Sequence, residues 1–197
     1  QCLQEIGICF MLATRYHPSM RHISPIRQEL GLRTVFNLLG PLANPARVKR
    51  QLLGVFSRDW TMPMAEVMKK LGTEKAWIVH GEDGMDEITT TGKTHVTALS
   101  RGHIQSFTIN PEEFGIPLAE PQELQGRTAT ENAHAITRLL AGEGGPYRDI
   151  VMLNAAAALV VADRVGDITV GLQIAGEAID SGAAADALAK LVMLTNA

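Results

Sequence analysis

The fold is decided by residues 51–80, whose sequence is QLLGVFSRDWTMPMAEVMKKLGTEKAWIVH. Apolar runs at 51–56 and 75–80 predict two buried strands. Between them, residues 61–71 have helical spacing, and Gly72 is a typical helix stop. A strand–helix–strand unit of 30 residues has the size of a parallel crossover connection. This stretch therefore favours an α/β fold.

Two strands and four helices are expected further along the chain. Residues 94–99 and 103–109 alternate like strands, with a hairpin-type turn at Arg101-Gly102. The expected helices cover residues 131–140, 149–164, 169–181 and 184–194. The run Ile150–Ala162 is apolar nearly all round, so its helix should be central and buried. The pattern predicts one α/β domain over residues 1–197, with helices on both sides of a mostly parallel sheet.

The segment before the crossover unit is less regular. Residues 3–14 have helix-like spacing, and Ser19 or Ser24 could cap a second helix that ends near Gly31. The chain opens at Gln1, inside the first expected helix and without a methionine, which raises the expectation of a fragment of something longer.

The composition excludes several classes of protein. The 197 residues are 46% hydrophobic and 20% charged, which excludes a disordered or low-complexity fibrous chain. A net charge of −3 gives no global attraction to nucleic acid or to a membrane, and no apolar run reaches the length of a membrane helix. Two cysteines, Cys2 and Cys9, do not make a disulfide scaffold, so a cytoplasmic location is expected.

The charges are unevenly spread along the chain. Between Arg15 and Arg50, seven basic residues are opposed only by Glu29, so this segment carries +6. Four acidic residues then crowd positions 82–87, directly after the expected strand 75–80, where α/β sheets bind ligands. This pattern favours an anionic substrate and a metal. A chance clustering of solvated charges is the alternative.

A proline- and glycine-rich stretch lies at residues 36–45, with the sequence FNLLGPLANP. Pro41 fixes the backbone φ angle and lacks a donor, so the stretch should form a rigid turn. A rigid apolar elbow could form one wall of a flat pocket, or it could simply join a helix to a strand. The residues alone leave both interpretations open.

Several motifs together resemble the family of anthranilate phosphoribosyltransferases. They follow the family's order and spacing: YHPSM at 16–20, RQELG at 27–31, RTVFNLLGPLANP at 33–45, HGEDGMDE at 80–87, NAAAAL at 154–159 and DSGAA at 180–184. The resemblance covers essentially the whole chain. It implies the C-terminal part of the family's larger domain, which has a nucleoside phosphorylase/phosphoribosyltransferase-like α/β fold.

The resemblance implies that the phosphoribosyl group of phosphoribosyl pyrophosphate is transferred to anthranilate, with release of pyrophosphate, in tryptophan biosynthesis. Arg27 matches the arginine that holds the anthranilate carboxylate, a task that suits a bidentate guanidinium. His17 matches a histidine of the anthranilate tunnel, and Pro41 would form part of its apolar wall. On the residues alone, Arg27 could equally be a surface helix arginine and His17 a structural histidine.

The acidic loop would serve as the magnesium site. Asp86 and Glu87 match the family's paired carboxylates, and magnesium is the implied cofactor. The loop neighbours Glu82 and Asp83 match no assigned position, and His80, at a strand end, is expected to be structural. No covalent nucleophile is expected, because neither cysteine lies in a matching motif and displacement at the sugar C1 needs none.

The chain departs from the family in its phosphate site. The glycine-rich Gly-Thr-Gly-Gly-Asp loop, the Lys-His-Gly-Asn segment and the small helical domain that forms the dimer interface are all absent. The glycine-dense stretch 142–146 reads as a loop between helices. The chain alone is therefore expected to be inactive, and a homodimer is implied only for the intact parent.

Two other functions stay open as alternatives. One is a pyrimidine nucleoside phosphorylase of the same superfamily, against which the elbow at 37–41 and the Asp86-Glu87 pair speak. The other is a non-catalytic nucleic-acid-binding relative or an inert fragment. Only the +6 segment supports nucleic-acid binding, which is therefore not expected, and neither is a membrane partner.

Overall fold

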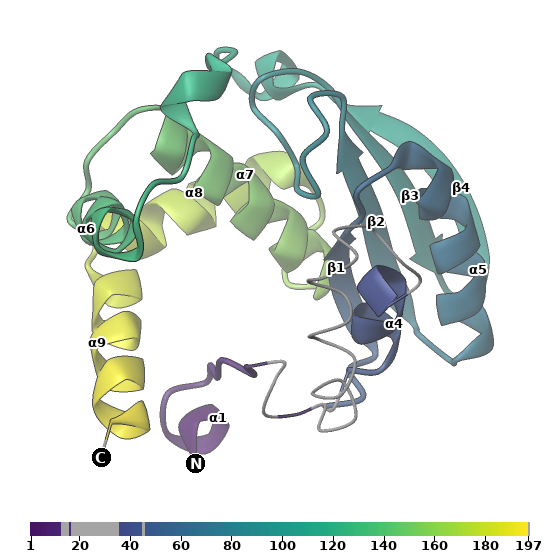
Figure 1. Ribbon diagram of the computed structural model, residues 1–197, viewed down its shortest axis with the longest axis horizontal. Helices are drawn as coiled ribbons and strands as arrows, with labels where there is room; N and C mark the ends of the chain where they lie inside the picture. Colours follow the sequence, from purple (N-terminus) through teal and green to yellow (C-terminus); the bar gives the residue numbers. More distant parts are fainter. Residues whose placement is uncertain (13–15, 17–35, 45, 197) are drawn as a thin grey trace, which may run out of the picture. The chain divides into compact units, whose positions relative to one another are not determined.

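The computed structural model describes residues 1–12, 16, 36–44 and 46–196 (Figure 1). The chain divides into two compact units, Gln1–Val48 with Ala189–Ala197, and Lys49–Leu188. The single domain expected over residues 1–197 stays a prediction.

The second unit is built on a four-stranded sheet in the order β1-β2-β3-β4, with strands at Arg50–Gly54, Lys75–Gly81, Thr94–Ser100 and His103–Ile109. The parallel β1–β2 pair confirms the expected crossover unit. The β2–β3 and β3–β4 pairs are antiparallel. The α/β class is thus confirmed, but the mostly parallel sheet is corrected to a mixed one among the described strands. The reason is that β2 to β3 and β3 to β4 lack the crossover helix that a parallel return needs.

The turn between β3 and β4 is the tight hairpin that the sequence predicts. Arg101 has a φ of 48° and Gly102 a φ of 80°. Two successive residues with positive φ match the twist of the flanking strands, and glycine takes such an angle without steric cost. The hairpin therefore fixes the antiparallel register in which Ser100 pairs with His103.

The helices of the second unit lie close to their expected positions. They are α5 (Thr61–Lys70), α6 (Ala129–Leu140), α7 (Pro146–Val161) and α8 (Ile168–Asp180), and α9 (Ala183–Thr195) begins in this unit. Short 3₁₀ turns occupy Arg58–Trp60 (η1), Pro111–Phe114 (η2) and Pro121–Glu123 (η3). Thr128 caps α6 in a reciprocal pair with Glu131.

Helices cover both faces of the sheet, as expected. Helix α5 packs against β2 and β3 on one face, and α7 packs against β1 and β2 on the other (Figure 1). Successive residues of a strand point to opposite faces, so Trp77 and Val79 face the α7 side while Ala76 and Ile78 face α5. With both faces covered, these four residues of β2 are all buried.

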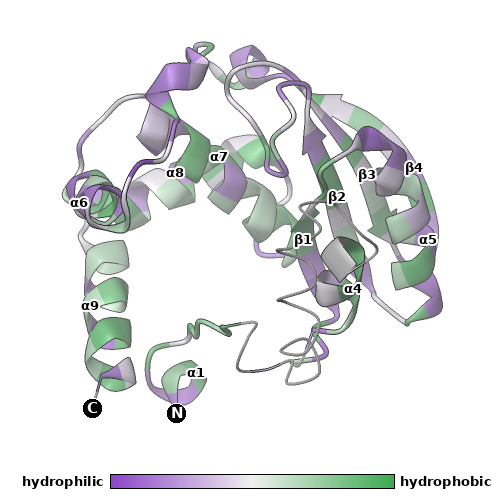
Figure 2. Cartoon of the chain, viewed as in Figure 1, coloured by the Kyte–Doolittle hydropathy of each residue, from purple (hydrophilic) through white to green (hydrophobic). Residues whose placement is uncertain are grey.

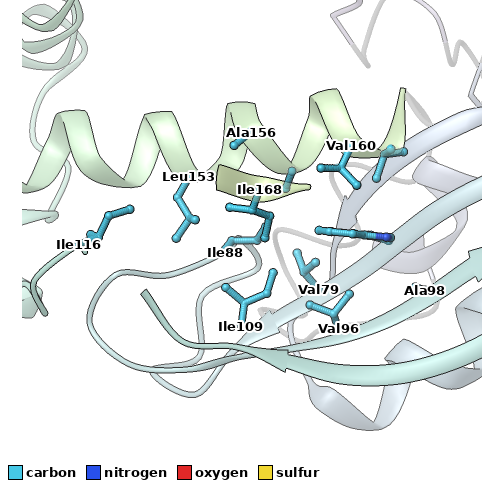
Figure 3. Packing of buried hydrophobic residues seen from close by; sticks show 13 residues of the cluster. Val79, Ile88, Val96, Ala98, Ile109, Ile116, Leu153, Ala156, Val160 and Ile168 are labelled. Atoms are coloured by element: carbon cyan, nitrogen blue, oxygen red, sulfur yellow. The ribbon is translucent and has the colours of Figure 1, made fainter. Parts of the chain in front are cut away.

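The main core lies between the sheet and α7. Figure 3 shows Leu153 and Val160 of α7 reaching toward Val79 and Val96 of the strands. Six residues of α7 are buried, which confirms the central helix expected at 150–162; they are Ile150, Leu153, Ala156, Ala157, Val160 and Val161. Helix α8 approaches α7 closely at Gly171, where an added Cβ would lie 2.8 Å from the Cα of Ala156.

The last helix remains partly uncovered. Hydrophobic residues dominate α9 in Figure 2. Its side chains Leu188, Val192 and Met193 are exposed in the described part of the chain. No helix among the described residues combines the length and the apolar character needed to cross a membrane.

The first unit contains two short helices, α1 (Cys2–Glu5) and α4 (Phe36–Leu42). Of the helix expected over residues 3–14, the structure describes residues 3–12, and these are helical only to Glu5, because Gly7 takes a φ of 76° and ends the first turn. The expected helix that ends near Gly31 lies outside the described residues. Both cysteines are free thiols, as expected.

The elbow predicted at residues 36–45 is largely helical. Helix α4 runs from Phe36 through Gly40 and Pro41 to Leu42. A turn follows α4, in which the side chain of Asn44 accepts a hydrogen bond from the backbone N–H of Ala46 at 2.9 Å. The rigid turn is therefore corrected to a helix with a short polar turn after it.

Candidate functional site

An acidic connection, residues 82–93, leaves the carboxyl end of β2 and leads to β3. The carboxyl end of the parallel strand β1 meets it there. A Cβ added to Gly54, the last residue of β1, would overlap the backbone carbonyl of Asp86. The backbone of Asp86 thus lies directly against the end of β1, at the sheet edge where α/β folds bind ligands.

Asp83 holds the first half of the connection together. Its carboxylate accepts hydrogen bonds from the hydroxyls of Thr89 and Thr91, both at 2.6 Å, and from the backbone N–H of Met85 at 3.0 Å. Burial acts to raise the pKa of Asp83, but these hydrogen bonds outweigh it and hold the pKa below the ordinary carboxyl value. The charged carboxylate of Asp83 therefore stabilises the conformation of the loop.

Backbone hydrogen bonds close the rest of the connection. The N–H of Gly81 donates to the carbonyl of Met85 at 2.9 Å, and the N–H of Glu82 donates to the carbonyl of Lys93 at the same distance. The connection is therefore an ordered polar structure, although most of its length is outside helix and strand.

Asn154 of α7 fixes the point at which the acidic stretch ends. Its Oδ1 accepts the backbone N–H of Ile88 at 3.0 Å, and its Nδ2 donates to the carbonyl of Ile88 at 2.7 Å. Nδ2 also donates to the carbonyl of Ile150, one turn back in α7, at 2.9 Å. The amide thus completes both backbone hydrogen bonds of Ile88 and is itself held by its own helix.

Asp86 and Glu87 lie between these fixed points, and both are exposed. Within the part of the chain that the structure describes, neither carboxylate makes a hydrogen bond or ion pair, and no group of three or more His, Cys, Asp or Glu side chains could hold a metal ion. Two free carboxylates open to solvent fit magnesium, which takes one or two carboxylates and fills its shell with water and phosphate oxygens. They would not suit a metal that needs a full cage of protein ligands.

The histidine at the end of β2 has a structural role, as expected. His80 Nδ1 lies 2.8 Å from the carbonyl oxygen of Val55, so it fastens β2 to the residue after β1. On β3, His95 pairs with His80 in register. Burial, the charge of Arg58 and the charge of His80, in that order, lower the pKa of His95. These effects favour the neutral form of the His95 imidazole.

The remaining predicted residues are less completely described. Arg27 and His17 lie outside the described residues. Pro41 lies near the end of α4 in the first unit and is partly buried. The glycine-dense stretch 142–146 joins α6 to α7, which confirms that it is a loop between helices. The site described here is thus the Asp86–Glu87 pair and its supports.

Two supporting residues have no role in the sequence interpretation. For Asp83, the threonines at 89 and 91 could have pointed to hydrogen bonds with a loop carboxylate. Asn154 begins the NAAAAL motif at 154–159 and interrupts the apolar run 150–162, but neither feature indicates which groups its amide binds. A lone amide in a buried helix needs hydrogen-bond partners. This need could have indicated that Asn154 binds polar groups of another segment.

A separate hollow in the second unit is lined by residues of η3, α6 and the start of α7. None of the residues 80–94 lines it. Two of its arginines are already paired, Arg138 with Glu143 at 3.0 Å and Arg148 with Asp180 at 2.7 Å. Its polar lining is therefore largely satisfied within the chain.

Known proteins share both the sequence and the fold. The chain is 53% identical over 195 residues to an anthranilate phosphoribosyltransferase of Rhodospirillum rubrum, covering 99% of the chain and 56% of the relative. It is 53% identical over 196 residues to the enzyme of the same name from a Bradyrhizobium species, covering all of the chain and 58% of the relative. The chain thus spans less than two thirds of the length of these curated relatives.

Solved structures agree with these relatives. An anthranilate phosphoribosyltransferase from Thermus thermophilus superposes with a TM-score of 0.91 at 41% identity, over 100% of this chain and 58% of that one. The Saccharomyces cerevisiae enzyme in complex with PRPP and Mg superposes with a TM-score of 0.81 at 31% identity, over 89% and 51% of the two chains. The observed sheet and helices therefore have the phosphoribosyltransferase and nucleoside phosphorylase-like fold that the sequence predicts.

A family model described as "Glycosyl transferase family, a/b domain" matches residues 1–185. That range contains all four strands, the acidic connection and the helix that carries Asn154. The chain therefore belongs to the glycosyl transferase family, whose a/b domain it carries.

Proposed function

We propose that the chain is part of a cytoplasmic anthranilate phosphoribosyltransferase, which transfers the phosphoribosyl group of phosphoribosyl pyrophosphate to anthranilate in tryptophan biosynthesis. One observation carries the proposal: two exposed carboxylates, Asp86 and Glu87, unpaired among the described residues, lie at the carboxyl end of the β1–β2 pair in a chain about half identical to enzymes of that name. A homodimer is proposed for the intact protein.

Asp86 and Glu87 would hold magnesium in this proposal. When bound, the ion supplies positive charge to the phosphate oxygens of the leaving pyrophosphate. The two side chains need no neighbour to release them, because neither makes a hydrogen bond or ion pair among the described residues. Their part is to present negative charge to the cation from a backbone whose two ends are fixed.

Arg27, His17 and Pro41 would bind anthranilate. A guanidinium can grip the carboxylate through two parallel hydrogen bonds, and the proline can contact the ring. The anthranilate nitrogen forms a bond to the sugar C1, the bond from C1 to the pyrophosphate oxygen breaks, and the nitrogen loses a proton. A neutral aromatic amine is a weak nucleophile, so orientation supplies much of the rate, and no covalent intermediate is required.

The proposed transfer also needs a phosphate-binding segment. These 197 residues contain no Gly-Thr-Gly-Gly-Asp sequence. We therefore expect no turnover by the isolated 197-residue chain and turnover only by a longer protein that contains it.

The test is an activity assay of the longer protein with phosphoribosyl pyrophosphate and Mg²⁺, in which consumption of anthranilate is followed by the loss of its fluorescence. Arg27→Ala should raise KM for anthranilate more than KM for phosphoribosyl pyrophosphate. An equal change in both KM values would show that Arg27 does not bind the carboxylate of anthranilate. Phosphorolysis of thymidine or uridine would point to a nucleoside phosphorylase, and salt-sensitive binding of DNA or RNA to a nucleic-acid-binding protein.

A further inference from the structure

The two carboxylates proposed for magnesium have no direct support of their own. They are exposed and make no hydrogen bond or ion pair among the described residues. Their position therefore depends on the backbone at each end of the Asp86-Glu87 dipeptide. The two ends are held in different ways.

The preceding end is held from within the loop. The carboxylate of Asp83 accepts the backbone N–H of Met85, and the carbonyl of Met85 accepts the N–H of Gly81. Below the loop, the absence of a side chain at Gly54 leaves room for the backbone of Asp86. This end would keep its shape as long as β2 and its own turn are intact.

The following end is held from a distant helix. Ile88 is fully buried, and Figure 3 shows its side chain in the core between α7 and the sheet. Both backbone hydrogen bonds of Ile88 go to the amide of Asn154, 66 positions further along the chain. The residue directly after the carboxylate pair is thus fixed by one side chain.

The chemistry of Asn154 suits this task better than that of any similar-sized side chain. One group must accept the N–H of Ile88 while its neighbour donates to the carbonyl, and only a primary amide offers both at this length. The second N–H of the amide bonds the carbonyl of Ile150 and fixes its orientation. Leucine would leave both groups of Ile88 unpaired, and aspartate would set an oxygen against two carbonyls.

We propose that Asn154 is a positioning residue for the metal-binding carboxylates, linking the central helix α7 to the spacing of Asp86 and Glu87. The inference rests on the proposed function, because it takes these two residues as the magnesium ligands. Asn154 does not touch the ion. It sets where the dipeptide ends, so that both carboxylates can approach the same cation.

The test measures cation binding and needs no turnover. Mn²⁺, an EPR-visible substitute for Mg²⁺, is titrated into the whole protein with and without pyrophosphate. Asn154→Leu keeps the branched shape of the side chain, is somewhat larger, and removes both hydrogen bonds to Ile88. We expect its Mn²⁺ dissociation constant to rise about 10-fold or more, which is typical when a residue that orients a metal ligand is lost.

A matched control separates positioning from general loss of stability. Thr97→Val also removes two hydrogen bonds of a buried side chain, from Thr97 Oγ1 to Thr61 Oγ1 at 2.9 Å and between Thr97 Oγ1 and Ser106 Oγ at 3.1 Å, but on the side of the sheet that α5 covers. Its Mn²⁺ affinity should match the wild type. If Asn154→Leu does not fold, Asn154→Asp replaces it. Its added negative charge would by itself tighten cation binding, so weaker binding would still identify lost positioning.

Asp86→Asn tests the proposed metal site separately from the positioning role of Asn154. Weaker Mn²⁺ binding in Asp86→Asn and in the Asn154 variant, with Thr97→Val unchanged, supports the inference. If Asp86→Asn weakens binding while the Asn154 variant does not, or if Thr97→Val weakens it equally, the positioning role is overturned and the proposed function stands. If Asp86→Asn has no effect, the proposed metal site fails, and the role of Asn154 fails with it.

Discussion

The core between α7 and the sheet and the acidic connection at 82–93 are stabilised by different forces. In the core, apolar side chains such as Leu153, Val160 and Val96 are buried against each other. In the connection, half of the residues are exposed, and hydrogen bonds from the side chains of Asp83 and Asn154 hold the backbone of Met85 and Ile88. The two regions touch at Ile88, whose side chain belongs to the core and whose backbone belongs to the connection.

This difference determines what each region tolerates. Apolar burial is non-directional, so a core accepts another hydrophobic side chain of similar volume. A hydrogen bond needs a donor and an acceptor in the right place, and a buried group that loses its partner is costly. The core should therefore respond to changes of volume, and the connection to changes of single polar atoms.

The largest loss of stability is expected in the core. Leu153→Ala removes a fully buried side chain of α7 and should lower the free energy of unfolding by about 2–5 kcal/mol. Urea unfolding followed by circular dichroism measures it. Val170→Ala on the partly exposed face of α8 is the control and should cost far less. Similar losses in both variants would contradict the assignment of the core.

Gly54→Ala tests the junction of the two regions. A methyl group there would overlap the carbonyl of Asp86, so the strand or the connection must move. We expect a loss of about 1–3 kcal/mol in the free energy of unfolding and weaker Mn²⁺ binding. Gly166→Ala is the matched control, because a Cβ at that position meets nothing within 4 Å. Unchanged Mn²⁺ affinity in Gly54→Ala would show that the end of β1 does not affect metal binding by Asp86 and Glu87.

Asp83→Asn tests the charge within the connection. The folded pKa of Asp83 lies below its unfolded value, so the ionised carboxylate stabilises the folded state above the unfolded pKa. That stability is lost as the pH falls through the folded pKa. The free energy of unfolding of the wild type should exceed that of Asp83→Asn by about 1 kcal/mol at pH 6. This difference should shrink below about pH 4. Urea unfolding across this pH range measures the difference. A difference that does not change with pH would mean that the shape of the Asp83 side chain, and not its charge, stabilises the fold.

The smallest effect is expected on the surface. Arg138 and Glu143 form an exposed ion pair at 3.0 Å. Arg138→Gln should change the free energy of unfolding by less than about 1 kcal/mol, and the change should vanish at high salt because exposed charges are screened. Thermal unfolding at low and high ionic strength provides the measurement. A large, salt-independent loss would indicate a packing role for the arginine stem.

The sequence predicted the elements of the second unit well because their signals are local. The alternation at 103–109 and the hairpin at Arg101-Gly102 depend on neighbours in the chain. The helix expected at 3–14 was wrong over its described residues 6–12 because one glycine, Gly7, outweighs an apolar spacing that looks helical. The parallel direction of most strands was wrong because strand direction depends on the connection between strands.

The candidate site was only partly predictable for the same reason. Asp86 and Glu87 could be named from their motif and their place after a strand. Their supports could not, since Gly54 and Asn154 lie 32 and 68 positions away from Asp86 in the chain and meet the connection only in three dimensions. No local pattern marks a glycine that leaves room for a distant carbonyl.

The sequence by itself determined the crossover unit, the central apolar helix and the chemical type of the acidic loop, because periodicity and residue chemistry are properties of short segments. Only the tertiary structure decided that the sheet is mixed, that Asp83 stabilises the conformation of the loop and that Asn154 completes the backbone of Ile88. Those facts arise where segments far apart in the chain meet, because buried backbone groups must find partners wherever the fold provides them.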